Sequence, residues 1–158
     1  MSSDDRGSED KSIVIVAAII EKDGKLLLVQ EGKEEVRGKW NAPAGHIKFG
    51  ENPLEAVKRE VAEETGFEVE PIELGRVFAF NNPENVPVLR FNVYCNLTGG
   101  TSERESAILD VHWFSKEELE SMKEKGELRS KRTWMTIQDW IENNRFPLEA
   151  INVLKEKF

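Results

Sequence analysis

The sequence contains a single cysteine, Cys95, so the chain cannot form an internal disulfide. Cys95 lies in the alternating apolar run RFNVYC, which indicates a buried structural thiol rather than a reactive one. The absence of disulfides is typical of proteins in the reducing cytosol. No export signal is visible, because the segment before the first apolar run is acidic. We therefore expect a cytoplasmic protein.

Two further absences narrow the function. The longest apolar run, SIVIVAAII, is far shorter than the ~20 residues needed to cross a bilayer. Basic residues are in deficit, since 22 Lys and Arg are set against 30 Asp and Glu, for a net charge of −8. Proteins that bind long nucleic acids or anionic membranes normally present a basic face. The sequence thus argues against both partners, although metal ions would still allow it to bind a small anion.

The length of 158 residues indicates one domain, large enough to bury a core without disulfides or zinc. Hydrophobic residues make up 39% and charged residues 33%, as in an ordinary globular protein. Residues 1–11 are small, polar and charged, and we predict that they form a disordered arm. Residues 12–158 contain no repeat and no long linker, and are predicted to form a single domain.

The pattern of elements predicts an α/β fold. Strands are expected at 11–20, 25–31, 66–80, 86–98 and 109–115, and Asp23-Gly24 marks a hairpin turn. Helices are expected at 115–125, capped by Ser115, and at 133–144, with a turn or two more in 147–158. Strand pairs followed by one helix, more strands and then helices favour a mixed sheet covered by helices.

The clearest helix signal follows residue 51. Asn52 is a good N-cap, Pro53 suits the first helical position, and Glu55 completes a capping box. Gly66 is expected to end the helix as its C-terminal cap. The apolar residues recur at intervals of three and four, which predicts a core-facing stripe of Leu54, Val57 and Val61.

Three glutamates crowd one turn of this helix, off the apolar stripe. Glu60 and Glu64 lie one turn apart on the same face, and Glu63 flanks them. Their mutual repulsion would be relieved by a divalent cation such as Mg²⁺ or Mn²⁺, which prefers oxygen ligands. Alternatively, they are solvated charges offset by Lys58 and Arg59. A calcium buffer is excluded, because calcium ligands of that kind come from a twelve-residue loop.

The stretch GHIKFGENPLEAVKREVAEETGF resembles the Nudix box, G-x5-E-x7-R-E-U-x-E-E-x-G-U, where U is a bulky apolar residue. The aromatic Phe67 is the only position that stretches the pattern. RGKWNAPAG before the box and LDVHWFSKEEL after it extend the resemblance over roughly residues 12 to 122, and 132–158 has no assigned counterpart. The matching positions are Gly45, Glu51, Arg59, Glu60, Val61, Glu63, Glu64, Gly66 and Phe67.

The resemblance implies a Nudix fold, an α/β/α sandwich around a mixed sheet. It also implies hydrolysis of a pyrophosphate bond in a small nucleotide-like substrate, by water with Mg²⁺ or Mn²⁺. Glu60 and Glu64 would be the principal metal ligands, and Glu63 a further ligand or the proton acceptor. The backbone carbonyl of Ala44 would be another ligand, although Ala44 stands where many members have glycine. Acids outside the box also stay open as proton acceptors, namely Glu84, Glu103 and Glu105.

The remaining box residues are expected to support these ligands. Arg59 would orient a neighbouring glutamate, and Glu51 would steady the loop before the helix. Gly45 would permit a backbone conformation that a side chain obstructs. The substrate contacts that we predict outside these positions are Phe49, Arg37, Lys39 and Arg90. Other aromatic residues and the two histidines are expected to be structural, namely Phe80, Phe91, Trp113, Trp134, His46 and His112.

The resemblance does not choose a substrate. It is compatible with oxidised purine nucleotides, other nucleoside di- and triphosphates, thiamine precursors, ADP-ribose and dinucleoside polyphosphates. Pairing of two copies, as in many members, is also compatible with it. The alternative function is a non-catalytic Nudix module that binds a nucleotide or a protein partner as a sensor. The complete glutamate set favours the enzyme, since a module that only binds has no chemical need for all three.

Overall fold

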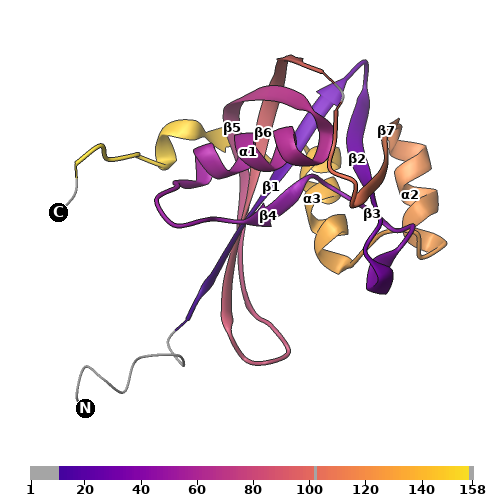
Figure 1. Ribbon diagram of the computed structural model, residues 1–158, viewed down its shortest axis with the longest axis horizontal. Helices are drawn as coiled ribbons and strands as arrows, with labels where there is room; N and C mark the ends of the chain where they lie inside the picture. Colours follow the sequence, from indigo (N-terminus) through magenta and orange to yellow (C-terminus); the bar gives the residue numbers. More distant parts are fainter. Residues whose placement is uncertain (1–10, 102, 157–158) are drawn as a thin grey trace.

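The computed structural model describes residues 11–101 and 103–156 (Figure 1), so residues 1–10 of the predicted arm lie outside the described residues. The chain begins with the hairpin of β1 (Ile13–Lys22) and β2 (Lys25–Glu31). Its turn uses Asp23 and Gly24, both with positive φ, as an Asp-Gly hairpin requires. The predicted loop that follows contains one 3-10 turn, Glu34–Val36, and leads to the short strands β3 (Trp40–Asn41) and β4 (Ala44–His46).

The helix α1 (Pro53–Thr65) begins and ends where the sequence predicts. The Asn52 side chain accepts hydrogen bonds from the amides of Leu54 and Glu55, both at 3.0 Å, and Glu55 completes the capping box. Gly66 caps the C-terminus with a φ of 78°. Val57 and Val61 are fully buried. Local sequence alone therefore specifies this helix and the face that it buries.

Three long strands and two helices follow: β5 (Phe67–Asn81), β6 (Pro87–Gly100), β7 (Ile108–Phe114), α2 (Lys116–Glu124) and α3 (Lys131–Glu142). The last part of the described chain contains β8 (Phe146–Pro147) and a single 3-10 turn, Leu148–Ala150, where the sequence predicted a turn or two. None of the helices in the described ranges has the length and apolar composition that a membrane-spanning segment needs.

The strands form one mixed sheet in the order β3-β2-β1-β6-β5-β8, with β4 paired to β1 and β7 paired to β2. β1 and β6 run parallel, and the other pairs are antiparallel. Alternation along β1 divides the core in two. Val16, Ala18 and Ile20 pack with α1, whereas Ile19 packs with α2 and α3.

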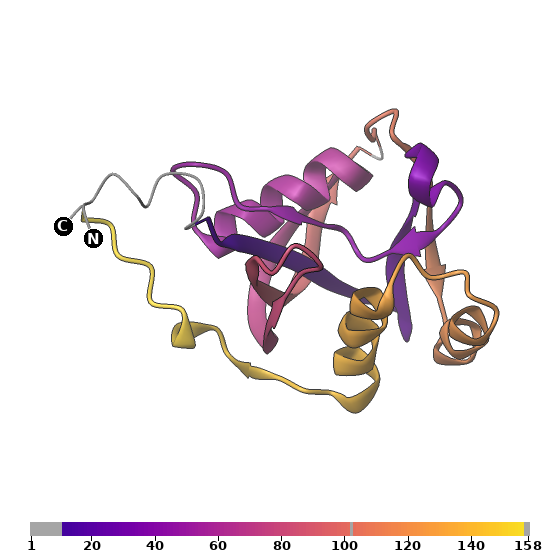
Figure 2. The same ribbon diagram turned by 90° about the horizontal axis from the view of Figure 1, so that it is seen from below.

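Figure 2 shows α1 on one side of the sheet and α3 on the other. The fold is therefore the α/β/α sandwich that the resemblance implied. Cys95, predicted to be buried, is only 4% exposed, and burial raises the pKa of its thiol to about 12. The strand β4, at one edge of the sheet, meets the C-terminal half of α1, where Glu60 and Glu64 lie.

Candidate active site

The strand β4 lies at an edge of the sheet and turns its free side toward α1. The Ala18 amide donates to the Pro43 carbonyl at 2.8 Å, and the Ile47 amide donates to the Val14 carbonyl at 3.0 Å. Because backbone groups alternate along an antiparallel strand, the N–H and C=O of Ala44 both point away from β1. That N–H donates to Oε2 of Glu64 at 3.0 Å. The Ala44 carbonyl therefore faces the same side as the Glu64 carboxylate.

Gly45 is required by a close approach of α1 to β4. A Cβ placed on Gly45 would overlap the carboxylate of Glu60. Gly45 pairs with Val16, whose side chain belongs to the face covered by α1. Gly45 therefore makes room for the side chain of Glu60, and the amide of its neighbour Ala44 holds the side chain of Glu64.

Arg59 connects the glutamates to the loop before the helix. It binds Glu51 through Nε at 2.6 Å and Nη2 at 2.9 Å, in a bidentate pair. Its Nη1 donates to Glu60 at 2.8 Å and to Glu63 at 3.1 Å. Its Nη2 also donates to the His46 carbonyl at 3.0 Å. Arg59 thus fixes the position of the Glu60 side chain, and Glu51 ties the loop to the helix.

A cavity of about 350 Å³ opens beside these groups, and we name it the acid cavity. Glu60 and Glu64 line it from α1, and Glu105 lines it from the loop between β6 and β7. The Glu105 amide donates to the Glu63 carbonyl at 2.9 Å, which holds this loop against the helix. The rest of the lining consists of Glu31, Lys33, Ala44, Gly45, His46, Ala107, Ile108 and Arg129.

The electrostatics of the acid cavity disfavour carboxylate charge when no cation is present. Burial raises the pKa of Glu64 to about 9, the nearby Glu60 adds to the rise, and the Ala44 amide opposes it. Burial also raises the pKa of Glu60, against the opposing effect of Arg59. Glu51 differs, because its hydrogen bonds from Arg59 lower its pKa to about 2. Among the described residues Glu60 is thus paired with a cation, Arg59, whereas Glu64 forms no ion pair.

Comparison with known proteins places this geometry in a family. The model of the NUDIX domain matches residues 10–139. Phosphatase NudJ of Escherichia coli is 34% identical over 145 residues, which cover 89% of this chain and 91% of NudJ. The chain belongs to the Nudix family.

Two further relatives agree with this assignment. The putative nudix hydrolase 1 of Caenorhabditis elegans is 37% identical over 115 residues, 69% of this chain, and the match spans only 30% of that longer protein. A solved NUDIX hydrolase from Nitrosomonas europaea superimposes with a TM-score of 0.83 at 30% identity, covering 93% of this chain and 100% of its own. The protein is therefore a hydrolase of the Nudix fold.

The donor set of this Nudix hydrolase suits a hard divalent cation. Glu60, Glu64 and the Ala44 carbonyl supply oxygen atoms at one side of the acid cavity, and oxygen ligands are those that Mg²⁺ and Mn²⁺ prefer. Within residues 11–101 and 103–156, no group of three or more acidic, histidine or cysteine side chains is arranged so that it could hold a metal ion. Arg59 instead occupies one oxygen each of Glu60 and Glu63. The residues thus fit an open site completed by substrate and water.

The raised pKa of Glu64 predicts how stability changes with pH in the metal-free protein. Folding makes this carboxyl bind its proton more tightly, so its contribution is fully present below about pH 4.5 and is lost as the pH rises toward about 9. With chelator present, we expect the free energy of unfolding to fall by about 1–3 kcal/mol between about pH 6 and pH 8. Thermal unfolding across that range measures the slope.

The same pH series on Glu64→Gln shows how much of the slope comes from Glu64, since the glutamine amide does not titrate. We expect this variant to lose most of the pH slope and to be the more stable protein at the alkaline end. The substitution Glu124→Gln, at the exposed end of α2, is expected to keep the slope of the unchanged chain. Equal slopes for the Glu64 variant and the unchanged chain would show that Glu64 is ionised in the metal-free fold.

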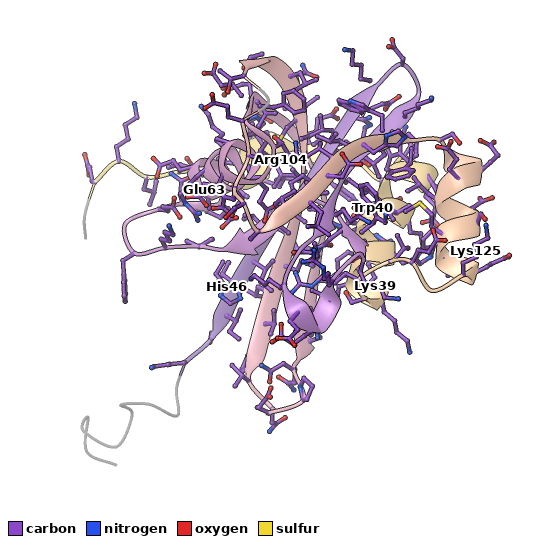
Figure 3. The ribbon with its side chains drawn as sticks, turned by 45° about the vertical axis from the view of Figure 1, so that its right-hand side comes forward. Lys39, Trp40, His46, Glu63, Arg104 and Lys125 are labelled. Carbon is purple, nitrogen blue, oxygen red and sulfur yellow. The ribbon has the colours of Figure 1, made fainter. Side chains whose placement is uncertain are left out.

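Of the four predicted substrate contacts, one lines a cavity and three do not. Arg90 lines a second cavity next to the acid cavity. Phe49 is fully exposed at the tip of the loop after β4. Arg37 donates to the Gly32 carbonyl at 3.2 Å, and Lys39 donates to the Gly126 carbonyl at 2.5 Å. Phe49, Arg37 and Lys39 line neither cavity. Figure 3 shows Lys39 beside Trp40, away from Glu63.

The loop acids also separate. Glu105 reaches the acid cavity, whereas Glu84 lies exposed in the turn between β5 and β6, and Glu103 is exposed outside the cavity lining. The aromatic residues are mainly structural, as Phe91 and Trp113 pack on the α1 side of the core and Trp134 on the other. His112 packs against Trp40 and Phe114, but His46 lies at the rim of both cavities.

The charged residues at the two cavities that the sequence prediction missed are Glu31, Lys33, Arg129 and Arg132. Glu31, 5% exposed, accepts from Arg129 at 3.0 Å across 98 residues of sequence. A charged residue at the end of the buried strand LLLVQE was the available signal for Glu31. Arg129 and Arg132 lie after residue 122, beyond the stretch that the resemblance covers, where the sequence offered no comparable signal.

Proposed function

We propose that this Nudix hydrolase cleaves a pyrophosphate bond in a small nucleotide-like substrate with the help of Mg²⁺ or Mn²⁺. The observation that carries the proposal is the acid cavity, where Glu60 and Glu64 face the free carbonyl side of β4. The matching Nudix relative NudJ is named a phosphatase, which supports phosphate chemistry. When bound, a divalent cation would neutralise phosphate charge and lower the pKa of a water molecule.

Each residue of the cavity has a separate task in this proposal. Glu60, Glu64 and the carbonyl of Ala44 hold the cation. Glu105 is the acid best placed to accept the proton from the attacking water, because it is exposed at the cavity while Glu63 is paired with Arg59 and Lys48. Arg59 positions Glu60 and does not itself touch the substrate. Glu51 and Gly66 maintain the ends of the loop and the helix.

A nucleotide panel tests the proposal. We expect the protein to release phosphate, pyrophosphate or a nucleoside monophosphate from at least one nucleoside di- or triphosphate or nucleoside diphosphate derivative with Mg²⁺. Chelator should reduce the rate to the blank, and added Mg²⁺ or Mn²⁺ should restore it. Turnover that persists in chelator would contradict the metal role. Nucleotide binding without any turnover would instead indicate a sensor.

The cell compartment and the domain limits belong to the same proposal. The single cysteine, which leaves the chain without an internal disulfide, supports the reducing cytoplasm as the place of action. Both halves of the described chain contribute to one sheet and to the same pair of cavities, which supports a single domain from residue 12 onward.

A further inference from the structure

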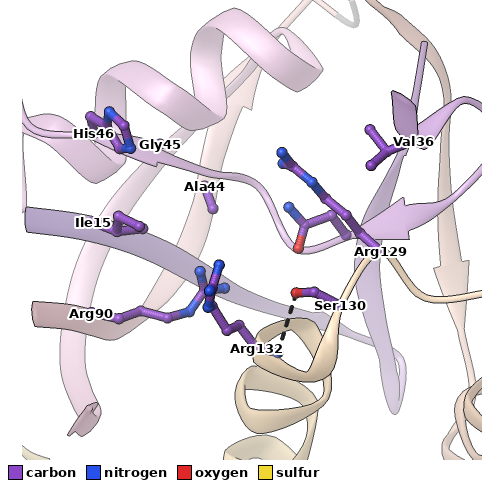
Figure 4. A pocket seen from close by; sticks show the side chains of 10 residues that line it. Ile15, Val36, Ala44, Gly45, His46, Arg90, Arg129, Ser130 and Arg132 are labelled. Carbon is purple, nitrogen blue, oxygen red and sulfur yellow. Dashed lines mark hydrogen bonds between the residues drawn. The ribbon is translucent and has the colours of Figure 1, made fainter. Parts of the chain in front are cut away.

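A second cavity, of about 240 Å³, lies beside the acid cavity and is lined by three arginines (Figure 4). We name it the arginine cavity. Arg90 enters it from β6, Arg132 from the first turn of α3, and Arg129 from the segment just before that helix. The described residues that line it include no carboxylate. In a chain of net charge −8, such a concentration of positive charge needs an explanation.

Arg90 is the most unusual of the three. It is only 4% exposed, yet its Nε has no hydrogen-bond partner in the described structure. Its Nη2 donates to Thr136 at 3.1 Å, and no ion pair joins Arg90 or Arg132 to a carboxylate among the described residues. Burial and the charges of Arg132 and Arg129 lower the pKa of Arg90 to about 10. A buried charge of this kind is costly unless an anion joins it.

The register of the sheet explains why the two cavities adjoin. Ile15 on β1 pairs with His46 on one side and with Arg90 on the other, so these three side chains share the sheet face opposite α1. Gly45, next to His46, belongs to the face where Glu60 lies. The glutamates and the arginines therefore lie on opposite sides of the edge strand β4. Four residues line both cavities: Ala44, Gly45, His46 and Arg129.

Neighbouring side chains hold two of the arginines in place. The guanidinium of Arg132 stacks over the Phe80 ring at 4.8 Å, and Ser130 caps the helix that presents it by accepting from the Arg132 amide at 3.2 Å. Arg129 is fixed by Glu31 at 3.0 Å. Planar guanidinium groups with free N–H donors match the oxygen atoms of a phosphate. The cavity is smaller than the ~300 Å³ from which drug-sized sites begin, so it suits one such group better than a base with its sugar.

We propose that the arginine cavity is a phosphate subsite, which binds the terminal phosphate of the substrate while the acid cavity acts on the anhydride. This inference rests on the proposed function. A terminal phosphate carries a charge of about −1.5 to −2, whereas a phosphate linked through oxygen on both sides carries about −1. Two unpaired guanidinium groups therefore favour pyrophosphates with a free end, such as nucleoside di- and triphosphates, over ADP-ribose or dinucleoside polyphosphates.

Binding of inorganic phosphate without metal tests the subsite directly. At constant ionic strength and with chelator, titration calorimetry should detect phosphate binding to the full chain, and dimethyl phosphate should bind at least about tenfold more weakly. Arg132→Gln should weaken phosphate binding at least about tenfold. The neighbouring exposed residue provides a matched control, since Lys131→Gln removes the same charge outside the cavity and should change binding less than about twofold. Equal phosphate affinity in the Arg132 variant and the unchanged chain would overturn the proposal.

Arg90→Gln gives a second measurement, with circular dichroism to verify folding. It should also weaken phosphate binding, because it removes the buried guanidinium that reaches Thr136. In turnover with Mg²⁺, Arg132→Gln should raise the KM for ADP at least about tenfold, with little change in kcat and little change in the kinetics of ADP-ribose. Phosphate binding that follows the variants without any turnover would sink the proposed hydrolysis but retain the subsite. Hydrolysis that prefers ADP-ribose and is unchanged in both arginine variants would support the proposed hydrolysis and overturn the subsite.

Discussion

Glu64→Gln is expected to lower kcat of the Mg²⁺-dependent hydrolysis at least about 100-fold, equivalent to about 2.7 kcal/mol of barrier. Glu64 is held against β4, with one oxygen bonded to the Ala44 amide and with Glu60 nearby. Glutamine preserves the shape and an acceptor for that amide but cannot supply the negative charge that holds a cation. Steady-state rates across a series of Mg²⁺ concentrations measure the loss.

Matched variants make this result specific. Glu63→Gln should lower kcat less than Glu64→Gln does, since Glu63 pairs with Arg59 and Lys48 and does not line the acid cavity. Glu105→Gln should reduce kcat and remove the acidic limb of its pH profile if Glu105 accepts the proton. Glu124→Gln, which removes an exposed charge from α2, should retain full activity. A Glu64 variant that turns over at the rate of the Glu124 variant would refute the metal-ligand assignment.

Asp139→Ala is expected to reduce the free energy of unfolding by about 3–5 kcal/mol, because it leaves buried donors without a partner. Asp139 is fully buried on α3. Its carboxylate accepts from the Arg76 amide at 2.9 Å, the Arg76 Nε at 2.5 Å and the Asn92 side chain at 2.8 Å. Asn144 adds a fourth hydrogen bond at 3.1 Å. Urea unfolding followed by tryptophan fluorescence measures the change.

The neighbouring residue is a suitable control, because the side chain of Gln138 bonds, among the described residues, only to Glu142 at the surface. Gln138→Ala should cost less than about 0.5 kcal/mol. Asp139 also joins α3 to β5 and β6, and Arg129 and Arg132 lie at the start of that helix. Loosening this anchor should weaken phosphate binding as well as stability. An Asp139→Ala protein as stable as the control would show that the buried network contributes nothing net.

This network gives a role to the C-terminal segment, which the resemblance left unassigned. Tyr94 donates to the Asp139 carbonyl at 2.9 Å, and Thr133 donates to Asn41 at 2.8 Å. Side chains on three strands therefore hold α3 against the sheet face opposite α1. Gly75 is part of the fit, since a Cβ there would crowd the Asp139 carboxylate. The helix thereby presents its arginines next to β4.

Much of this architecture could be predicted from local sequence. Asn52, Pro53, Glu55 and Gly66 set the limits of α1, because caps depend on interactions within a few residues. The Asp23-Gly24 turn fixed the first hairpin for the same reason. The strands of 66–80 and 86–98 were recognisable by their apolar alternation, although their register was not, because pairing joins residues far apart in the chain.

The sequence by itself determined the glutamate-bearing helix, its caps and the family to which the chain belongs, since these depend on fixed spacing over a short segment. Only the tertiary structure decided which loop acid reaches the helix and which arginines gather beside it. Glu64 and Glu105 line the same cavity although 41 positions separate them in the sequence (105 − 64). Arg90 and Arg132 share the other cavity and are 42 positions apart (132 − 90). These long-range contacts depend on the register of the sheet and on the docking of the helices. Many weak contacts determine both together, and no local sequence pattern encodes them.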